Sequence, residues 1–395
     1  SDYTNQWNYK APASSSYGIN LPTAWDITTG SSSVVVAVVD TGIRFNHPDL
    51  SGRTVPGYDF ISDDLVSNDG NGRDSDPSDP GDWVTNAESQ SGYFQGCDPT
   101  SSYWHGSHVA GIIGAASNNG VGMAGINWSG KLLPVRVLGK CGGMTSDIID
   151  GIRWAAGIDI TGVPHNSNPA KVINISLGGS GRCSFAEQSA INDVVSRGAV
   201  VVVAAGNENQ NASNSSPANC NNVISVAATD HNGNRAFYSD YGTVIKLSAP
   251  GGGNESNPSD AILSTVDTGA QGPQAPGYAN YIGTSMATPH VTGVVSLMFS
   301  LDASLTPAQV LQLLQANVTR FPSGSTCTTA NCGAGIVNAA AVLQAVQNRT
   351  GATPSPTAAA TATPVPTTSA TPTFVPTVVG AQDQRLYLPL VRQRK

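Results

Sequence analysis

Short apolar runs alternate with longer apolar windows along most of the chain. The short runs are rich in β-branched residues and lack polar alternation, which is typical of strands buried on both faces of a parallel sheet. The alternation predicts βαβ units and therefore an α/β fold. The expected strands are 34–39, 132–137, 172–175, 200–204, 223–227 and, more weakly, 261–266; the expected helices are 105–116, 146–156, 185–197, 285–301, 307–317 and 338–347.

Two of the expected strands deliver polar side chains at their carboxyl ends. The run 34–39 ends in Asp40, and the run 199–205 is followed by Asn207. Ligands of open α/β sheets gather at this edge. We therefore expect Asp40 and Asn207 to lie on one functional edge of the sheet.

A nine-residue segment, 283–291 (GTSMATPHV), places Ser285 after two small residues and before a long apolar run. Pro289 fits the first turn of the helix that this run predicts, because a missing N–H costs little there. Ser285 should thus lie at a helix N-terminus, where free N–H groups and the helix dipole favour a developing oxyanion. Taken alone, such a serine is more often a helix cap.

A base and an orienting acid precede this serine. His105 opens a small-residue helix (HGSHVAG), and the order Asp40, His105, Ser285 is that of subtilisin. With the segment 204–208 (AAGNE), these motifs make the chain resemble the subtilisin-like serine proteases, or subtilases, over about residues 15–347. The resemblance implies a three-layer α/β sandwich with a central, mostly parallel sheet.

The resemblance also implies a role for each residue. Ser285 attacks the scissile carbonyl and His105 transfers its proton, while Asp40 orients the imidazole. The Asn207 amide joins the Ser285 N–H in stabilising the oxyanion. Ser107 stands where many relatives have Thr, and since both carry a hydroxyl, we expect activity to survive.

Other interpretations of these residues remain open. His105 and His108 form an H-x-x-H pair, but no third His or Cys follows at a zinc-like spacing. A lipase-like hydrolase would have a G-x-S-x-G elbow around Ser285, which is missing. A catalytically silent binding protein on the same fold is the alternative function. His108, His47 and His290 are interpreted as structural.

Composition narrows the class of protein. The formal net charge of −8 argues against nucleic acid as a partner, and charged residues make up only 12% of the chain. No apolar stretch approaches the length of a membrane helix. The chain starts at Ser1 without a basic and apolar leader. We interpret it as the mature form of a secreted, extracellular enzyme that acts as a monomer on protein substrates.

Six cysteines indicate an oxidising compartment, and none lies in a C-x-x-C pattern. Many pairings are possible. Following the resemblance to secreted bacterial relatives, we expect the following disulfides: Cys97–Cys141, Cys183–Cys220 and Cys327–Cys332.

Two calcium sites are hypothesised. By resemblance, Asp49 and the loop 117–123 with Asn119 would hold one ion through oxygen ligands, although no clear N-terminal Gln ligand precedes Tyr17. The second candidate is the acidic segment 69–82, which departs from the EF-hand pattern and is equally well interpreted as a solvated insertion. Its candidate ligands are Asp69, Asn71, Asp74 and Asp76.

Substrate contacts are expected by resemblance. Two segments should pair with an extended peptide backbone, which predicts broad specificity. Small residues should leave a pocket for a large apolar side chain before the cut, with Glu208 at its rim to attract Lys or Arg. These residues are Gly142 and Gly143; Ser176, Leu177 and Gly178; and Ala204, Ala205, Gly206 and 215–218.

The composition changes abruptly near Gly351. We predict three parts: a peptidase domain at 1–350, a flexible Thr/Pro/Ala-rich linker at 351–380, and an apolar-basic tail at 381–395. The tail is too short to span a membrane. It is either a surface-retention or export signal, or a terminal segment without function.

Overall fold

A seven-stranded parallel sheet forms the centre of the molecule. The computed structural model describes residues 2–13, 16–351 and 385–386. The strand order is β10-β9-β7-β5-β1-β3-β2, so β1 lies between strands that follow it in the sequence. Its strands are β1 Val35–Asp40, β2 Tyr58–Asp59, β3 Lys131–Arg136, β5 Val172–Ile175, β7 Val200–Ala204, β9 Ile224–Thr229 and β10 Leu247–Pro250.

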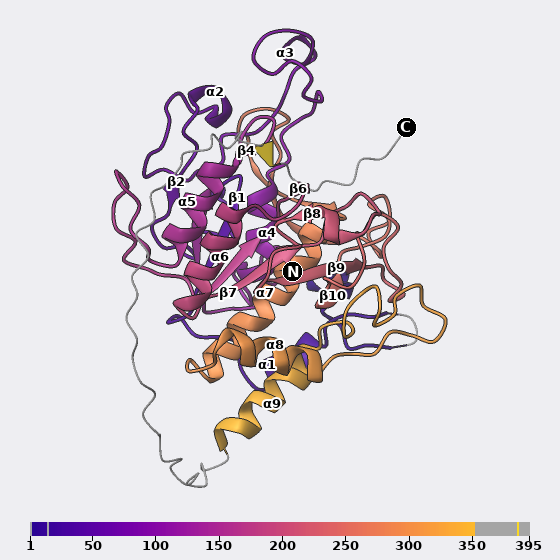
Figure 1. Ribbon diagram of the computed structural model, residues 1–395. Coiled ribbons are helices and arrows are strands. Elements are labelled where there is room, and N and C mark those ends of the chain that lie inside the picture. The colour runs from indigo at the N-terminus through magenta and orange to yellow at the C-terminus, as the bar shows by residue number, and fades with distance from the viewer. Residues whose placement is uncertain (1, 14–15, 352–384, 387–395) are drawn as a thin grey trace, which may run out of the picture.

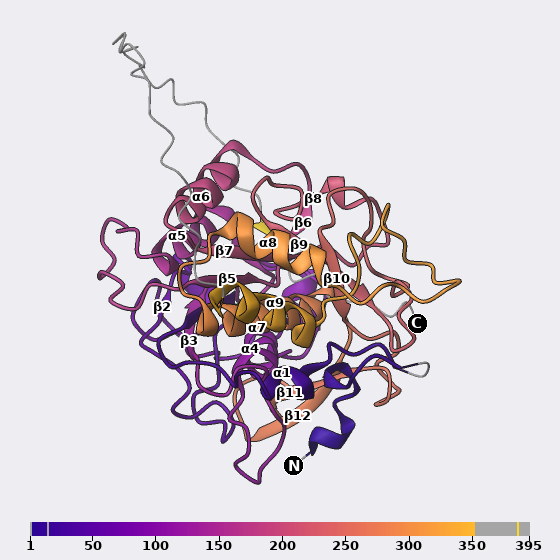
Figure 2. The ribbon, with the colours of Figure 1, turned by 90° about the horizontal axis from the view of Figure 1, so that it is seen from below.

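Helices cover both faces of this sheet and complete three layers. Figure 2 shows α5 (Thr145–Ala155) and α6 (Phe185–Ser196) on one side, and α4 (His105–Gly114) and α7 (Thr284–Leu301) on the other. Two separate apolar clusters fill the two interlayer spaces. α9 Ala339–Gly351 packs against α7, and α1 Leu21–Trp25 and α8 Pro307–Ala316 both pack against α9.

Smaller elements decorate this core. Figure 1 shows the loop that carries α3 projecting from one end of the molecule. An antiparallel hairpin, β11–β12, and two two-residue pairs, β6–β8 and β4–β13, lie outside the central sheet. These elements are β4 Gly143–Met144, β6 Gly179–Ser180, β8 Ser215–Ser216, β11 Ile262–Asp267, β12 Pro276–Tyr281, β13 Arg385–Leu386, α2 Asp64–Ser67, α3 Asn86–Gln90 and the 3-10 helices Asp2–Asn5, Trp7–Tyr9 and Ala212–Asn214.

The predicted α/β class and the three-layer architecture are confirmed. Five expected strands lie in the central sheet, but the expected strand 261–266 instead forms β11 of the antiparallel hairpin. Two sheet strands were not expected, because β2 has only two residues and β10 combines small residues with Pro250. The predicted linker and tail lie outside the described residues except for Gly351 and β13.

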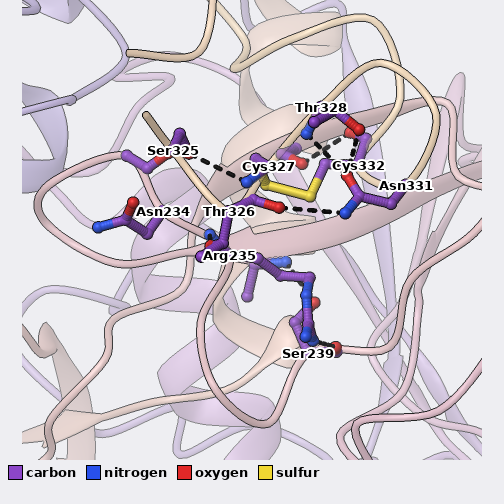
Figure 3. Close-up of a disulfide and its surroundings, with 12 residues drawn as sticks. Asn234, Arg235, Ser239, Ser325, Thr326, Cys327, Thr328, Asn331 and Cys332 are labelled. Carbon is purple, nitrogen blue, oxygen red and sulfur yellow. Dashed lines mark hydrogen bonds between the residues drawn. A yellow bond between two sulfur atoms is a disulfide. The ribbon is translucent and has the colours of Figure 1, made fainter. Parts of the chain in front are cut away.

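Three disulfides close loops around the core: Cys97–Cys141, Cys183–Cys220 and Cys327–Cys332. They follow the pairing implied by the resemblance. The third closes a small turn beside β10, and Figure 3 shows the polar side chains that surround it. There the Ser325 hydroxyl accepts from the Cys327 N–H at 3.0 Å, and the Asn331 amide donates to the Thr326 carbonyl at 3.1 Å.

Candidate active site

Asp40 is the last residue of β1, and His105 is the first residue of α4. Both side chains are fully buried. Nδ1 of His105 lies 2.7 Å from Oδ1 of Asp40, which also accepts the Thr41 N–H at 2.8 Å. Because the carboxylate fixes the proton on Nδ1, Nε2 is the free basic nitrogen. Among the described residues Nε2 has no hydrogen-bond partner.

A second layer of polar groups supports this pair. The Thr41 hydroxyl accepts the Gly106 N–H at 3.0 Å and donates to Oδ2 of Asp79 at 2.7 Å. Thr41 thus ties the end of β1 to the first turn of α4. Burial raises the pKa of the Asp79 carboxyl, as well as that of the neighbouring Asp82.

Ser285 is the second residue of α7 and is only 1% exposed. Pro289 lies in the second turn of the helix, so the expectation of a first-turn proline was wrong by one turn. Its missing N–H leaves the Ser285 carbonyl without its helical donor. The Ser176 hydroxyl donates to that carbonyl at 3.0 Å, and the Ser285 hydroxyl donates to the Ser176 carbonyl at 3.1 Å.

A buried polar chain extends this contact into the core. The Thr292 hydroxyl of α7 donates to Oδ1 of Asn174, and the Asn174 amide donates to the Ser176 hydroxyl, each at 2.9 Å. These groups are fully buried and satisfy one another. The register between α7 and β5 is therefore fixed by hydrogen bonds as well as by apolar packing.

The Asn207 side chain is oriented by the residue before the serine. Its Oδ1 accepts both the N–H and the hydroxyl of Thr284, each at 2.9 Å. Nδ2 has no partner among the described residues. A methyl group added to Gly283 would lie 3.4 Å from Nδ2 and 3.6 Å from the Ser285 N. Two N–H donors therefore border one space that glycine leaves open.

His108 has structural partners on the β11–β12 hairpin. Nε2 of His108 lies 3.1 Å from the carbonyls of Ile262 and Ala279, and its ring stacks on Tyr281. Burial lowers the pKa of His108 to about 3. His105 and His108 thus engage different partners, and the described residues hold no group of three metal-ligating side chains.

One of the two predicted backbone-binding segments contacts Ser285 directly. Ser176 follows β5 and contacts Ser285, while Leu177 is fully buried. Gly178 approaches the Ser216 carbonyl so closely that an added Cβ would lie 2.8 Å from it. Gly142 ends a tight turn, and Gly143 begins β4.

Carboxylates gather near the expected side-chain pocket. Ala204 ends β7 and is buried, and a Cβ added at Gly206 would lie 2.4 Å from Oδ2 of Asp240 and 2.9 Å from Oε2 of Glu208. Oε2 of Glu208 accepts the Asn207 N–H at 2.9 Å. Burial raises the pKa of both carboxyls.

The first calcium hypothesis joins two residues that the structure does bring together. Oδ1 of Asp49 accepts the Asn119 amide at 2.9 Å, and Oδ2 accepts the Met123 N–H and the Tyr278 hydroxyl. Asp49 is fully buried without a cationic side chain among these partners. The pair fits calcium if Asn119 turns its oxygen toward Asp49, since Ca²⁺ takes oxygen ligands.

In the second candidate calcium site, the acidic segment 69–82, Asp69 pairs with an arginine side chain. The buried Arg136 guanidinium contacts Asp59 and lies 2.6 Å from Oδ2 of Asp69. Asp74 accepts from the Asn71 amide and the Asp76 N–H, and Asp76 accepts the Ser78 hydroxyl. Arg136 thus balances the charge of Asp69, whereas Asp74 and Asp76 accept from neutral donors.

Comparison with known proteins shows the family of this chain. The model of the subtilase family matches residues 31–351. The chain belongs to the subtilase family. This subtilase is 50% identical over 346 residues to an extracellular protease of Xanthomonas campestris pv. campestris, covering 87% of this chain and 56% of the relative. It is 38% identical to thermitase of Thermoactinomyces vulgaris, covering 72% of this chain and 81% of the relative.

A solved structure is also similar to this subtilase. A protease of Pseudoalteromonas arctica matches with a TM-score of 0.81 and 50% identity, covering 87% of this chain and 98% of that chain. The Xanthomonas relative and an extracellular basic protease of Dichelobacter nodosus are longer, and this chain spans just over half of each, 56%. Subtilases commonly bind structural calcium. In the described residues of this subtilase, no helix has both the length and the apolarity to cross a membrane.

Sequence reasoning missed the supporting groups. Thr41 and Thr284 stand inside the motifs that identify Asp40 and Ser285, but their hydroxyls point to partners far away in the sequence. Asp79 belongs to the acidic segment considered for calcium, whereas in the structure it supports Thr41. Ser107 keeps a defined role, because its hydroxyl accepts the Arg44 N–H at 2.9 Å.

Proposed function

We propose that this subtilase is a secreted serine endopeptidase that hydrolyses peptide bonds through an acyl-enzyme. Two observations carry the proposal: the Asn207 Nδ2 and Ser285 N donors converge on the space at Gly283, and Nε2 of His105, the base that Asp40 orients, has no partner among the described residues. The relatives that are named extracellular proteases support it. A silent binding protein is disfavoured, because it would have no physical reason to keep the base His105, its orienting acid Asp40 and the serine together with the two donors.

The reaction follows from the positions of these atoms. Ser285 Oγ leaves the Ser176 carbonyl and attacks the substrate carbonyl carbon while its proton passes to Nε2 of His105. The oxyanion accepts from the Asn207 and Ser285 N–H groups. When the C–N bond breaks, His105 returns the proton to the leaving amine. Water then repeats the sequence on the ester, and Asp40 stabilises the imidazolium in both halves.

Casein hydrolysis and labelling by a serine-directed fluorophosphonate test this function. The parent chain should cleave and label, and Ser285→Ala should do neither while keeping the same circular dichroism and thermal midpoint. Ser323→Ala, at an exposed position, serves as the matched control. A folded parent that neither cleaves nor labels would contradict the proposal and favour the binding protein.

For specificity, we propose broad cleavage with a preference for Phe, Leu or Tyr before the cut. Ala204 and Gly206 supply the small walls that such a side chain needs. Peptide anilides differing only in that residue test it. A clear preference for Arg would overturn it, and Glu208→Gln would then show whether that carboxylate is the cause.

We propose that calcium binds at Asp49 and Asn119, and that Arg136 takes the place of an ion in the acidic segment. We further propose that residues 1–350 form the peptidase domain, with the linker and tail following as predicted. We also propose that the protein is a monomer and that the tail retains it at the cell surface. Deleting 351–395 and comparing secreted with cell-bound protein tests the retention signal.

A further inference from the structure

Strand β4 pairs with a segment from the far end of the chain. β4 lies outside the central sheet, and its strand partner within the described residues is β13. The pairing is antiparallel, with Arg385 opposite Met144 and Leu386 opposite Gly143. The C-terminal segment thus adds a strand to an element that packs against Val137, whose N–H donates to the Asp40 carbonyl at 2.9 Å.

The position of β4 is fixed by a closed turn, a disulfide and a close backbone contact. The turn before it is closed by two hydrogen bonds between Gly139 and Gly142, and Cys141 is fastened to Cys97. A Cβ at Gly143 would lie 2.1 Å from the Val137 carbonyl, so the backbone of β4 is pressed against the end of the preceding strand. The edge that faces β13 is therefore the edge left for an added strand.

This edge is also the one expected to receive substrate. Gly143 belongs to the segment assigned to pairing with an extended peptide, and such pairing reads backbone rather than side chains. One edge of a strand accepts one partner at a time. A C-terminal segment paired with β4 therefore excludes a substrate from the same backbone groups.

We propose that the C-terminal segment around Arg385–Leu386 is a ligand of the chain's own substrate-binding edge and competes there with extended peptides. The competition with substrate rests on the proposed endopeptidase function, whereas the pairing of the C-terminal segment with β4 does not depend on it. Competition should weaken the binding of long substrates and leave substrates that do not reach β4 unaffected.

Charge and chain length both support this occupant. Residues 381–395 include four basic residues and one acidic residue, in a chain whose net charge is −8, so the rest of the chain is more acidic than the total. Opposite net charges favour association and weaken it with salt. In Figure 1, α9 and β4 lie at opposite ends of the molecule. Residues 352–384 can bridge this separation, because an extended Pro-rich chain spans about 3.1 Å per residue.

Because the C-terminal segment belongs to the same chain as β4, even a weak contact between them can be populated. A flexible connection of this kind gives an effective concentration of the order of millimolar. Two residues of antiparallel pairing thus suffice for partial occupancy. We expect occupancy to change exchange and affinity by about two- to tenfold.

Hydrogen exchange tests the docking in a chain that cannot cut itself. In Ser285→Ala, the amides of residues 139–145 should exchange about two- to tenfold faster when Arg385→Pro and Leu386→Pro are added, because proline cannot donate to the pairing. Arg392→Pro with Gln393→Pro is the matched control, since it removes the same charge and adds as many prolines. Equal exchange in both double variants would overturn the proposal.

Inhibition tests the competition in the active chain. A synthetic 381–395 peptide should raise KM for a tetrapeptide anilide and leave KM for N-acetyl-tyrosine ethyl ester unchanged. The same peptide with both prolines should leave both KM values unchanged. Equal effects of the two peptides would overturn the competition. A parent chain that hydrolyses no substrate would refute the proposed function instead, while the exchange experiment would still decide the docking.

Discussion

Two N–H donors meet in the space beside Gly283, and only one of them is a side chain. Asn207→Leu removes this donor while leaving Ser285 and His105 in place. We expect kcat to fall about 100- to 1,000-fold, the range found for an oxyanion donor in the related enzyme subtilisin, with little change in KM, because the donor acts on charge that develops in the transition state. Steady-state kinetics on a peptide anilide measure both constants.

Asn221→Leu is the control for this change, because Asn221 is exposed and makes its contacts elsewhere. It should keep the parent kcat. A rise in KM with an unchanged kcat in Asn207→Leu would assign Asn207 to ground-state binding and remove it from the oxyanion site.

Protonation of the buried His290 ring makes the stability of the fold depend on pH. Its Nδ1 donates to the Met286 carbonyl, and Nε2 accepts the Asn8 amide at 2.7 Å, so the folded chain holds the neutral ring. Burial lowers its pKa to about 4. The unfolded chain binds a proton below about pH 6.5 and the folded chain does not, so stability is lost as pH falls from 6.5 to 4.

We expect His290→Gln to lose about 3 kcal/mol less unfolding free energy than the parent between these pH values. Urea unfolding at each pH measures the difference. His165→Gln, at a side chain that is 63% exposed, should behave as the parent does. Parallel pH profiles for His290→Gln and the parent would show that His290 titrates alike in both states.

At the scale of elements, Arg136 at the end of β3 connects three parts of the fold. Its guanidinium contacts Asp59 of β2, the Ser67 carbonyl at the end of α2, and Asp69 of the acidic segment. Arg136→Gln leaves the buried Asp59 carboxylate without its cation. We expect a loss of about 3–5 kcal/mol, measured by urea unfolding at pH 7.

Arg182→Gln, at an exposed position, is the matched control and should cost little. If Arg136→Gln loses little unfolding free energy, and this loss grows when a calcium chelator is added, then a bound ion also balances the carboxylate charge. That result would restore the second calcium hypothesis.

Apolar positions were sufficient to predict most of the central elements, because buried parallel strands are continuously apolar and each covering helix has an apolar face. β11 was misplaced for the same reason, since an apolar run does not reveal whether its partner strand is parallel. β2 was missed because two residues carry no period. β13 was missed because its pairing depends on β4, which is distant in the sequence.

For the site, local motifs located Asp40, His105, Asn207 and Ser285, since each stands at the end of an element. The Thr41–Asp79 contact and the Ser176–Ser285 exchange could not be predicted. They join segments that only the folded chain brings together, and hydroxyls and carboxylates at those positions have many alternative partners.

At the scale of the whole molecule, calcium at Asp49 should raise the thermal midpoint, since a ligand that binds only the folded state stabilises it. We expect excess EDTA to lower the midpoint of the parent by about 5 °C. Asp49→Asn should lose this dependence on calcium, and the matched Asp74→Asn should keep it. An unchanged parent midpoint in EDTA would contradict the site.

Helix α7 has a consequence for the time at which the enzyme can first act. Residues 284–299 are buried around the whole circumference of the helix, so the face of the sheet that α7 covers cannot be completed until this late segment has been synthesised. Domains fold largely as units once their parts are available. A ribosome-bound chain that ends before α7 contains Asp40, His105 and Asn207 and the apolar cluster of one sheet face, but lacks the helix that fills the other face and carries Ser285. The proposed peptide-bond cleavage would thereby be postponed until α7 has been translated, which would spare the cell that makes the chain.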